Sequence, residues 1–241
     1  MVLVHGLWAA AWILEGWLEP AAERGWDAWA PNLRGREGSR PVADLGRVRM
    51  EDFAADLREV LERLGPSIVI GYSMGGLVAQ MVATDSQTQD LVRGLVLMCS
   101  VPPRGIVALS GPVLRASMRY VPAMIRGRAF RPTRDEADAM MMNDLPEAER
   151  ERWFPRFMPD AARAALQMAT GVGTARLPLP APVLVVSAEH DHISPPRIQP
   201  QLVRRYGAEH LPVAGHAHLI AIEPGWEAVE AAILDRIDAW R

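Results

Sequence analysis

The length, composition and charge of the chain limit the fold classes and the kinds of partner that we expect. It has 241 residues, of which 49% are hydrophobic, and a formal net charge of -3. This length fits one α/β domain, and the apolar content is sufficient to bury both faces of a sheet. Because so small a charge provides no basic face, we expect no nucleic-acid partner. All 26 basic side chains are Arg, and Lys is absent.

The single cysteine and the lack of long apolar stretches indicate where in the cell we expect the chain to be found. Cys99 has no second cysteine with which to form an internal disulfide, and we expect it to be a small buried hydrophobe. No stretch has the length and apolarity of a transmembrane helix, and the N-terminal residues do not resemble a signal peptide. We therefore expect a cytoplasmic protein without a membrane partner. The sequence does not indicate an oligomeric state.

Short apolar runs alternate with helical patterns, which predicts βα units around a mainly parallel sheet. Six strands are expected, at residues 2–4, 27–30, 67–70, 94–98, 183–187 and 210–213. Most of these runs are apolar throughout, as is typical of strands covered by helices on both faces. Between the strands predicted at residues 27–30 and 67–70, Phe53, Leu57 and Leu61 recur at helical spacing, and Gly65-Pro66 then ends the predicted helix.

The βα alternation stops between residues 102 and 177. This stretch shows helical patterns only and is rich in Met and Arg. We therefore predict an all-helical cap of residues 102–177, inserted between two strands of a core that comprises residues 1–101 and 178–241.

The sequence Gly71-Tyr72-Ser73-Met74-Gly75 joins a predicted strand to a predicted helix. A G-x-S-x-G motif in this position is typical of a nucleophile elbow, in which a sharp turn lifts the serine hydroxyl clear of the backbone. The flanking glycines allow that turn because they carry no Cβ. Ser73 is therefore the predicted nucleophile.

A serine nucleophile needs a base within hydrogen-bonding reach. Of the six histidines, we favour His216, because it follows the last predicted strand and catalytic groups of open α/β sheets gather at the carboxyl ends of strands. His218, only two residues further on, is the main competitor. Asp191 follows another strand at the same edge and is the predicted acid that orients the base, with Glu189 as the alternative. The order Ser73, Asp191, His216 is the order that this motif requires.

Backbone N–H groups near Ser73 are expected to stabilise a developing oxyanion. The segment His5-Gly6-Leu7-Trp8 follows the first predicted strand. The N–H of Leu7 and the N–H of Met74 are the expected pair of donors. His5 is expected to hold this loop in shape. The motifs call for no metal and no cofactor.

Taken together and in this order, the motifs resemble those of the α/β-hydrolase family over nearly the whole chain outside the cap. The matching segments are residues 2–6, 30–35, 71–75, 187–191 and 215–216. The resemblance implies a sheet of about six strands, similar to that of plant methyl esterases and hydroxynitrile lyases. Ser73 argues against the family members that use an Asp nucleophile, and the absence of Lys argues against the lysine-assisted hydroxynitrile lyases.

This resemblance implies a serine hydrolase that cleaves carboxylic esters through an acyl-enzyme intermediate. A small or medium, partly apolar ester is the expected substrate, and Trp8, Tyr72, Met141 and Trp153 are the expected pocket residues. Two alternatives stay open. The same triad could serve lactone hydrolysis, C–C bond hydrolysis or acyl transfer in a biosynthetic pathway, or the chain could be a hydrolase-like ligand receptor.

Overall fold

A five-stranded parallel sheet forms the centre of the computed structural model, which describes residues 1–108, 110–175 and 179–241. The strands are β1 (Val2–Val4), β2 (Ser67–Tyr72), β3 (Val92–Met98), β4 (Val183–Ala188) and β5 (Glu209–Val213). Neighbours in the sheet are also consecutive in the chain, and each pair is parallel. This arrangement confirms the predicted α/β-hydrolase fold class, with one strand fewer than expected.

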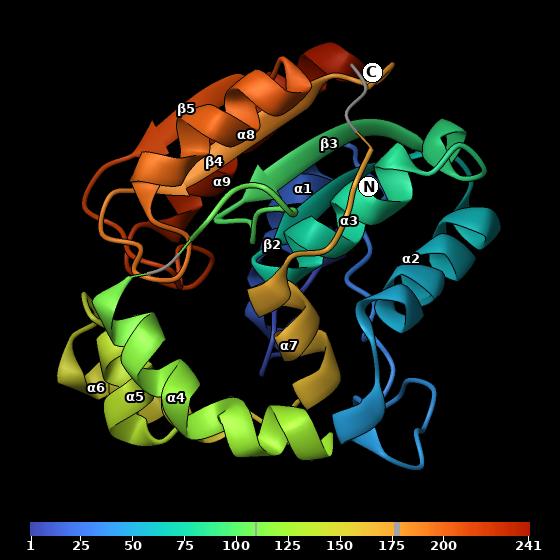
Figure 1. The fold of residues 1–241 in the computed structure, drawn as a ribbon. Helices are drawn as coiled ribbons and strands as arrows, with labels where there is room; N and C mark the ends of the chain where they lie inside the picture. Colours follow the sequence, from blue (N-terminus) through green and yellow to red (C-terminus); the bar gives the residue numbers. More distant parts are fainter. Residues whose placement is uncertain (109, 176–178) are drawn as a thin grey trace.

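The α-helices fall into a core group and a group inserted between β3 and β4 (Figure 1). The core group consists of α1 (Leu18–Glu23), α2 (Met50–Leu64), α3 (Met74–Thr84), α8 (Gln199–Tyr206) and α9 (Trp226–Ile237). The inserted group consists of α4 (Gly111–Arg126), α5 (Arg134–Met140), α6 (Glu147–Trp153) and α7 (Ala162–Thr170). Among the described residues, no helix is long and apolar enough to cross a bilayer.

Helices cover both faces of the sheet, which accounts for the continuously apolar strands. On one face, Phe53, Leu57 and Leu61 of α2 pack in the same cluster as Val69 of β2 and Leu97 of β3. The helices α3 and α8 complete this side, and α1 and α9 cover the other (Figure 1). Side chains of a strand alternate between its two faces, so each strand contributes to both apolar clusters.

The insertion between β3 and β4 is all-helical, as the sequence predicts. Its helices lie together on one side of the molecule, at the bottom of Figure 1, and α4 packs against α5 and α7. We call residues 102–175 of this insertion the cap. The predicted boundary at residues 177 and 178 lies outside the described residues, so the division into a core and a cap stays a prediction.

The strand predicted at residues 27–30 is not formed. Only one isolated bridge, between Val2 and Trp29, joins this segment to β1. Two backbone hydrogen bonds accompany it, from the Leu3 N–H to the Trp29 oxygen and from the Trp29 N–H to the Met1 oxygen. Pro31 has no N–H with which to continue the ladder, and Trp29 lies half exposed at the sheet edge.

Close packing of α3 on β1 leads to a stability prediction. A Cβ at Gly75 would lie 2.2 Å from the Val4 oxygen, whereas a Cβ at Gly173 would meet no atom within 4 Å. Because the obstructing atoms at Gly75 belong to the backbone of β1, Gly75→Ala should lower the free energy of unfolding by about 3 kcal/mol or more. Urea denaturation of Gly75→Ala and Gly173→Ala measures the difference. Equal unfolding free energies for the two variants would contradict this account.

Candidate active site

The turn between β2 and α3 places the Ser73 side chain at the edge of the sheet. Ser73 has φ 54° and ψ -118°, a conformation that L-residues rarely adopt. The close approach of the flanking segments explains why glycine stands on both sides, since a Cβ at Gly71 would lie 2.6 Å from the Gly75 oxygen. The elbow predicted from Gly71 to Gly75 is therefore formed, and Ser73 is held where its hydroxyl can reach other groups.

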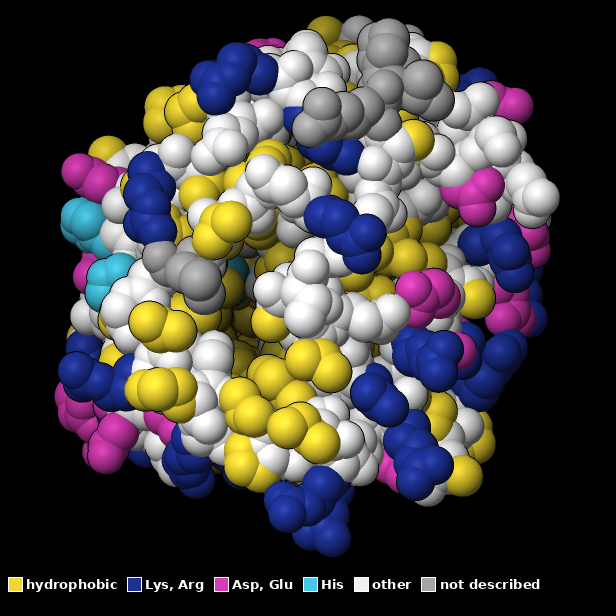
Figure 2. Space-filling model, in the orientation of Figure 1, with side chains coloured by type: hydrophobic (Ala, Val, Ile, Leu, Met, Phe, Trp, Pro, Cys, Tyr) yellow, Lys and Arg dark blue, Asp and Glu magenta, His cyan; other side chains and the backbone are white. Residues whose placement is uncertain are grey.

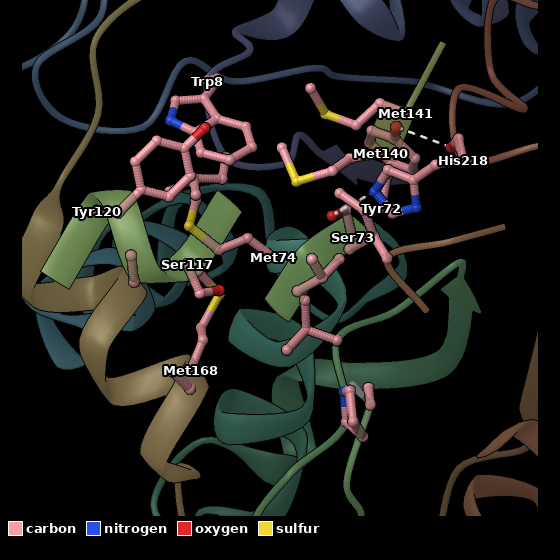
Figure 3. A pocket seen from close by; sticks show the side chains of 18 of the residues that line it. Trp8, Tyr72, Ser73, Met74, Ser117, Tyr120, Met140, Met141, Met168 and His218 are labelled. Carbon is pink, nitrogen blue, oxygen red and sulfur yellow. Dashed lines mark hydrogen bonds between the residues drawn. The ribbon is translucent and has the colours of Figure 1, made fainter. Parts of the chain in front are cut away.

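A chain of hydrogen bonds connects Ser73 to a buried histidine and a buried carboxylate; Figure 3 shows Ser73 and His218 side by side. The Ser73 Oγ lies 2.9 Å from Nε2 of His218, and Nδ1 of His218 lies 2.9 Å from Oδ2 of Asp191. All three residues are buried. When Nδ1–H of His218 donates its hydrogen bond to Asp191, the Nε2 lone pair is directed at the serine hydroxyl. This geometry suits proton transfer from Ser73 to His218.

Hydrogen bonds to both carboxylate oxygens hold Asp191 in place. While Oδ2 faces His218, Oδ1 accepts hydrogen bonds from the N–H groups of Ile193 and Ser194, each at 2.8 Å. The structure therefore brings the predicted acid to the predicted nucleophile. The alternative acid, Glu189, lies elsewhere and accepts a hydrogen bond from the N–H of Gly215 at 3.0 Å.

The prediction that His216 is the partner of Ser73 is wrong: the structure places His218 there. The Nδ1 of His216 donates to the Ala214 oxygen at 3.0 Å, and its Nε2 lies beside Gly225. The physical reason is the turn at Gly215, which has φ 66°. This turn aims His216 away from Ser73, and the chain is buried from Ala217 to Ala221, so that His218 lies in the interior.

Backbone contacts hold the histidine loop in this register. The His216 oxygen accepts from the His190 N–H at 2.9 Å, and a carboxylate oxygen of Glu223 accepts from the Ala217 N–H at 2.7 Å. The Tyr72 hydroxyl donates to the His218 oxygen at 2.9 Å. A signal for His218 is present in the sequence, because it directly precedes the apolar run Leu219–Ala221, which is buried in the structure, whereas His216 follows an exposed turn.

The loop after β1 passes close to Ser73, as the expected oxyanion donors require. A Cβ at Gly6 would lie 2.9 Å from the Ser73 Cβ, so only glycine allows this approach. Leu7 follows Gly6 and lines the cavity beside Ser73. Met74 is the first residue of α3, and its N–H therefore has no acceptor within that helix. Both residues thus lie beside the serine, and their role as oxyanion donors stays a prediction.

His5 supports this loop as a neutral imidazole. Its Nδ1 donates to the Gly6 oxygen at 2.9 Å, and its Nε2 accepts from the Leu33 N–H at 3.2 Å. Burial, together with the nearby positive charge of Arg36, lowers the pKa of His5 to about 3. With both ring nitrogens engaged, His5 holds the loop in shape.

A buried ion pair joins the same loop to the cap. Asp160 of the cap accepts from the Trp8 N–H at 2.6 Å and is paired with Arg36, whose side chain is likewise fully buried. The Nε of Arg36 in turn donates to the Ala9 oxygen at 2.7 Å. Sequence reasoning missed this connection, because Arg36 and Asp160 are far apart in the chain and neither belongs to a motif.

An apolar cavity of about 270 Å³ opens beside Ser73 and His218 (Figure 3). Three of the four predicted pocket residues line it: Trp8, Tyr72 and Met141. Side chains from the cap complete its wall, among them Val113, Ser117, Tyr120, Met124, Phe130, Met140, Phe157, Ala165 and Met168. Arg104 is the one Arg, Asp or Glu among the described lining residues. The site therefore combines a polar proton relay with a largely apolar chamber.

The prediction that Trp153 lines the pocket is wrong. Its ring stacks on Trp12 with centroids 5.6 Å apart and an interplanar angle of 10°, and its indole N–H donates to Glu149 at 2.7 Å. The last residue of α6 thus faces the junction of cap and core. Arg156 also lies over the rings of Trp12 and Trp153, and this contact helps to hold the Trp153 side chain away from Ser73.

Among the described residues, one group of side chains has the composition and spacing of metal ligands: Cys99, Asp191 and His218, whose candidate atoms lie within 4.8 Å of one another. Two of the three already form the hydrogen-bond chain to Ser73. Burial, with Asp191 nearby, raises the pKa of the Cys99 thiol well above its usual value. Cys99 is therefore a buried neutral thiol, as expected from the sequence.

The Arg36–Asp160 pair leads to a prediction on stability. Asp160→Ala leaves the Arg36 charge buried without its partner and removes the acceptor of the Trp8 N–H, so we expect unfolding to become easier by about 3–5 kcal/mol. The double variant Arg36→Met/Asp160→Ala removes both charges and should recover much of that loss. Glu62→Ala, which breaks an exposed pair with Arg58, is the matched control and should cost less than about 1 kcal/mol. Similar losses for Asp160→Ala and Glu62→Ala, in chemical denaturation, would contradict the assigned role.

Solved structures share this architecture over nearly the whole chain. A thermophilic esterase from Thermogutta terrifontis is 24% identical, with a TM-score of 0.75, and the match covers 99% of this chain and 89% of that one. A monoacylglycerol lipase from Paleococcus ferrophilus is 18% identical with a TM-score of 0.76, covering 100% and 94% of the two chains. A methylesterase from Arabidopsis is 15% identical with a TM-score of 0.73, covering 98% of both. These likenesses concern the fold.

The comparison with family models identifies the family of the chain, whereas the solved structures show only its fold. No curated protein matches the chain by sequence. Residues 1–232, however, match the model described as the alpha/beta hydrolase family. The match includes β1, the Ser73 elbow, Asp191 and His218. The chain therefore belongs to the alpha/beta hydrolase family.

Proposed function

We propose that this protein hydrolyses carboxylic esters, with Ser73 as nucleophile, His218 as general base and acid, and Asp191 as the residue that orients His218. The observation that carries the proposal is the hydrogen-bond chain through these three residues at the wall of an apolar cavity. A substrate in that cavity lies next to the Ser73 hydroxyl, which has the base His218 within hydrogen-bonding reach.

The acylation step follows from the geometry. The Ser73 Oγ attacks the ester carbonyl carbon while its proton passes to Nε2 of His218, 2.9 Å away. The charge that develops on the carbonyl oxygen is stabilised by the N–H groups of Leu7 and Met74, each worth about 3 kcal/mol in related sites. Asp191 stabilises the imidazolium through Nδ1. His218 then protonates the leaving alcohol, and an acyl group remains on Ser73.

Deacylation repeats these roles with water as the nucleophile. Nε2 of His218 accepts a proton from water, which attacks the acyl carbon. The resulting intermediate collapses, the proton returns to the Ser73 oxygen and the carboxylic acid leaves. Each residue finishes in its initial state, so the chemistry needs no cofactor.

The lining of the cavity supports an apolar substrate group. The wall consists largely of Met, Ile, Val and aromatic side chains, and Ser117, Tyr120 and Thr170 are the residues with hydroxyl groups that the described part of the cap contributes to it. An acyl or alcohol chain placed here gains free energy by leaving water, whereas an anionic group would meet few donors. Two of the structurally similar proteins described above are named as an esterase and a lipase, and these names denote enzymes that act on esters. This supports the same substrate class for the present chain.

The first prediction from this proposal concerns the base. Ser73→Ala and His218→Ala should each lower kcat/KM for p-nitrophenyl butyrate by at least about 10³-fold, because each removes one member of the relay. His216→Ala is the matched control, two residues away, and should retain activity within about threefold since His216 contacts neither residue. A larger loss in His216→Ala than in His218→Ala would contradict the assignment.

Simple esters also separate ester hydrolysis from the other reactions that the sequence leaves open. Steady turnover of p-nitrophenyl esters that depends on Ser73 supports ester hydrolysis. Covalent labelling of Ser73 with negligible turnover of such esters would instead favour lactone opening, C–C cleavage or acyl transfer. Ligand-dependent stabilisation with neither labelling nor turnover would favour a receptor.

The second prediction concerns acyl-chain length. Each methylene buried in the cavity should raise kcat/KM by up to about fourfold, so the rate should increase from p-nitrophenyl acetate to butyrate to hexanoate. Met141→Gln introduces an amide into the lining and should reduce the hexanoate-to-acetate ratio. Met118→Gln makes the same change on the exposed side of the cap and should leave the ratio unchanged. A ratio that is equal in all three proteins would contradict an apolar acyl site.

A further inference from the structure

Helix α4 carries apolar side chains on two adjacent faces. Its inner face lines the cavity with Val113, Ser117, Tyr120 and Met124. Its outer face presents four large apolar residues to solvent: Leu114, Met118, Val121 and Ile125, with exposed fractions of 53%, 65%, 44% and 68%. Each set follows the spacing of one helical stripe, and every residue of the outer set comes one position after a residue of the inner set. We call the four exposed residues the outer stripe.

The outer stripe is part of a larger exposed apolar patch beside the cavity. Of the seven large hydrophobic residues that are exposed in the described chain, five lie between residues 107 and 125. One of them, Val107, is 69% exposed and also lines the cavity, so it marks the mouth. Figure 2 shows hydrophobic side chains gathered around a hollow on this side of the molecule. Burying a patch this concentrated would stabilise a bound state.

The charged residues on α4 itself and on the chain segments that flank it are all positive. Between residues 91 and 134 the chain contains eight Arg and no Asp or Glu, although its overall net charge is -3. Arg115, Arg126 and Arg128 are exposed, and in the described part of the chain they form no ion pair with an acid. Arg119, by contrast, pairs with Glu136 at 2.8 Å. The apolar stripe is thus bordered by uncompensated guanidinium groups.

We propose that the outer stripe and its arginines form a docking surface for an anionic lipid bilayer, with α4 lying in the plane of the interface. An exposed apolar helix face bordered by basic residues matches the two components of such a surface, its acyl chains and its negative headgroups. The mouth at Val107 would then face the bilayer, so an apolar substrate could reach Ser73 without crossing bulk water. This proposal departs from the sequence-based expectation of no membrane partner.

Charge argues for a lipid surface over a second copy of the chain. In a twofold dimer the same patch would lie on both sides of the interface, and the arginines of one copy would approach those of the other. An anionic bilayer neutralises them instead. The proposal does not depend on ester hydrolysis, because binding to vesicles is measured without a substrate.

Co-sedimentation with vesicles tests the proposal. The wild-type chain is mixed with vesicles of phosphatidylcholine and phosphatidylglycerol in equal amounts, and separately with vesicles of phosphatidylcholine alone. We expect binding to the mixed vesicles that weakens as salt is added, and at least about tenfold less binding to phosphatidylcholine alone. Absence of binding to the mixed vesicles, or equal binding to both kinds, would overturn the proposal.

Three variants locate the binding surface. Met118→Glu/Ile125→Glu should lower partition by more than about tenfold, and Arg115→Gln/Arg126→Gln by about fivefold for each charge removed. Leu64→Glu makes the same kind of change at an exposed residue of α2 and should bind like wild type. All three should keep wild-type turnover of soluble p-nitrophenyl butyrate, which shows that they are folded. Loss of binding in Leu64→Glu alone, or a wild-type dimer that Met118→Glu/Ile125→Glu dissociates, would overturn the assignment.

Discussion

The close approach of three backbone segments at Ser73 is the constraint on which the site depends. Gly6, Gly71 and Gly75 each stand where a Cβ would come within 3 Å of a neighbouring atom. This crowding fixes the loop after β1, the end of β2 and the start of α3 against one another. Ser73 therefore keeps its positive φ, and the N–H groups expected to stabilise an oxyanion stay beside its hydroxyl. The backbone around Ser73 is therefore rigid, and it holds the serine hydroxyl in place beside His218.

The cap completes the site in a different way, through long-range contacts. Asp160 connects the cap to the loop that carries Trp8 and to Arg36 of the core, so the cavity wall and the oxyanion loop share one anchor. Helix α4 adds the inner wall of the cavity and at the same time exposes an apolar outer face. One element thus lines the substrate chamber and presents the proposed lipid-binding surface.

Local requirements made part of the site predictable from sequence. The Ser73 elbow needs glycines at fixed positions, and Asp191 lies in the loop that follows the clearly apolar strand β4. The choice between His216 and His218 depends on how the Gly215 turn directs the chain, and no spacing rule determines that. Arg36 and Asp160 meet only through tertiary packing, and Trp153 is drawn to Trp12 by stacking. The expected strand at residues 27–30 failed because Pro31 cannot extend the pairing.

The most direct test of the central claim is the rate at which a fluorophosphonate labels Ser73, followed by mass mapping of the adduct, in wild type, His218→Ala and His216→Ala. Labelling reports activation of the serine without requiring a substrate. The account predicts an adduct on Ser73, near-wild-type labelling in His216→Ala and a rate lower by at least about 10²-fold in His218→Ala. An adduct elsewhere, or slow labelling in His216→Ala with normal labelling in His218→Ala, would contradict it.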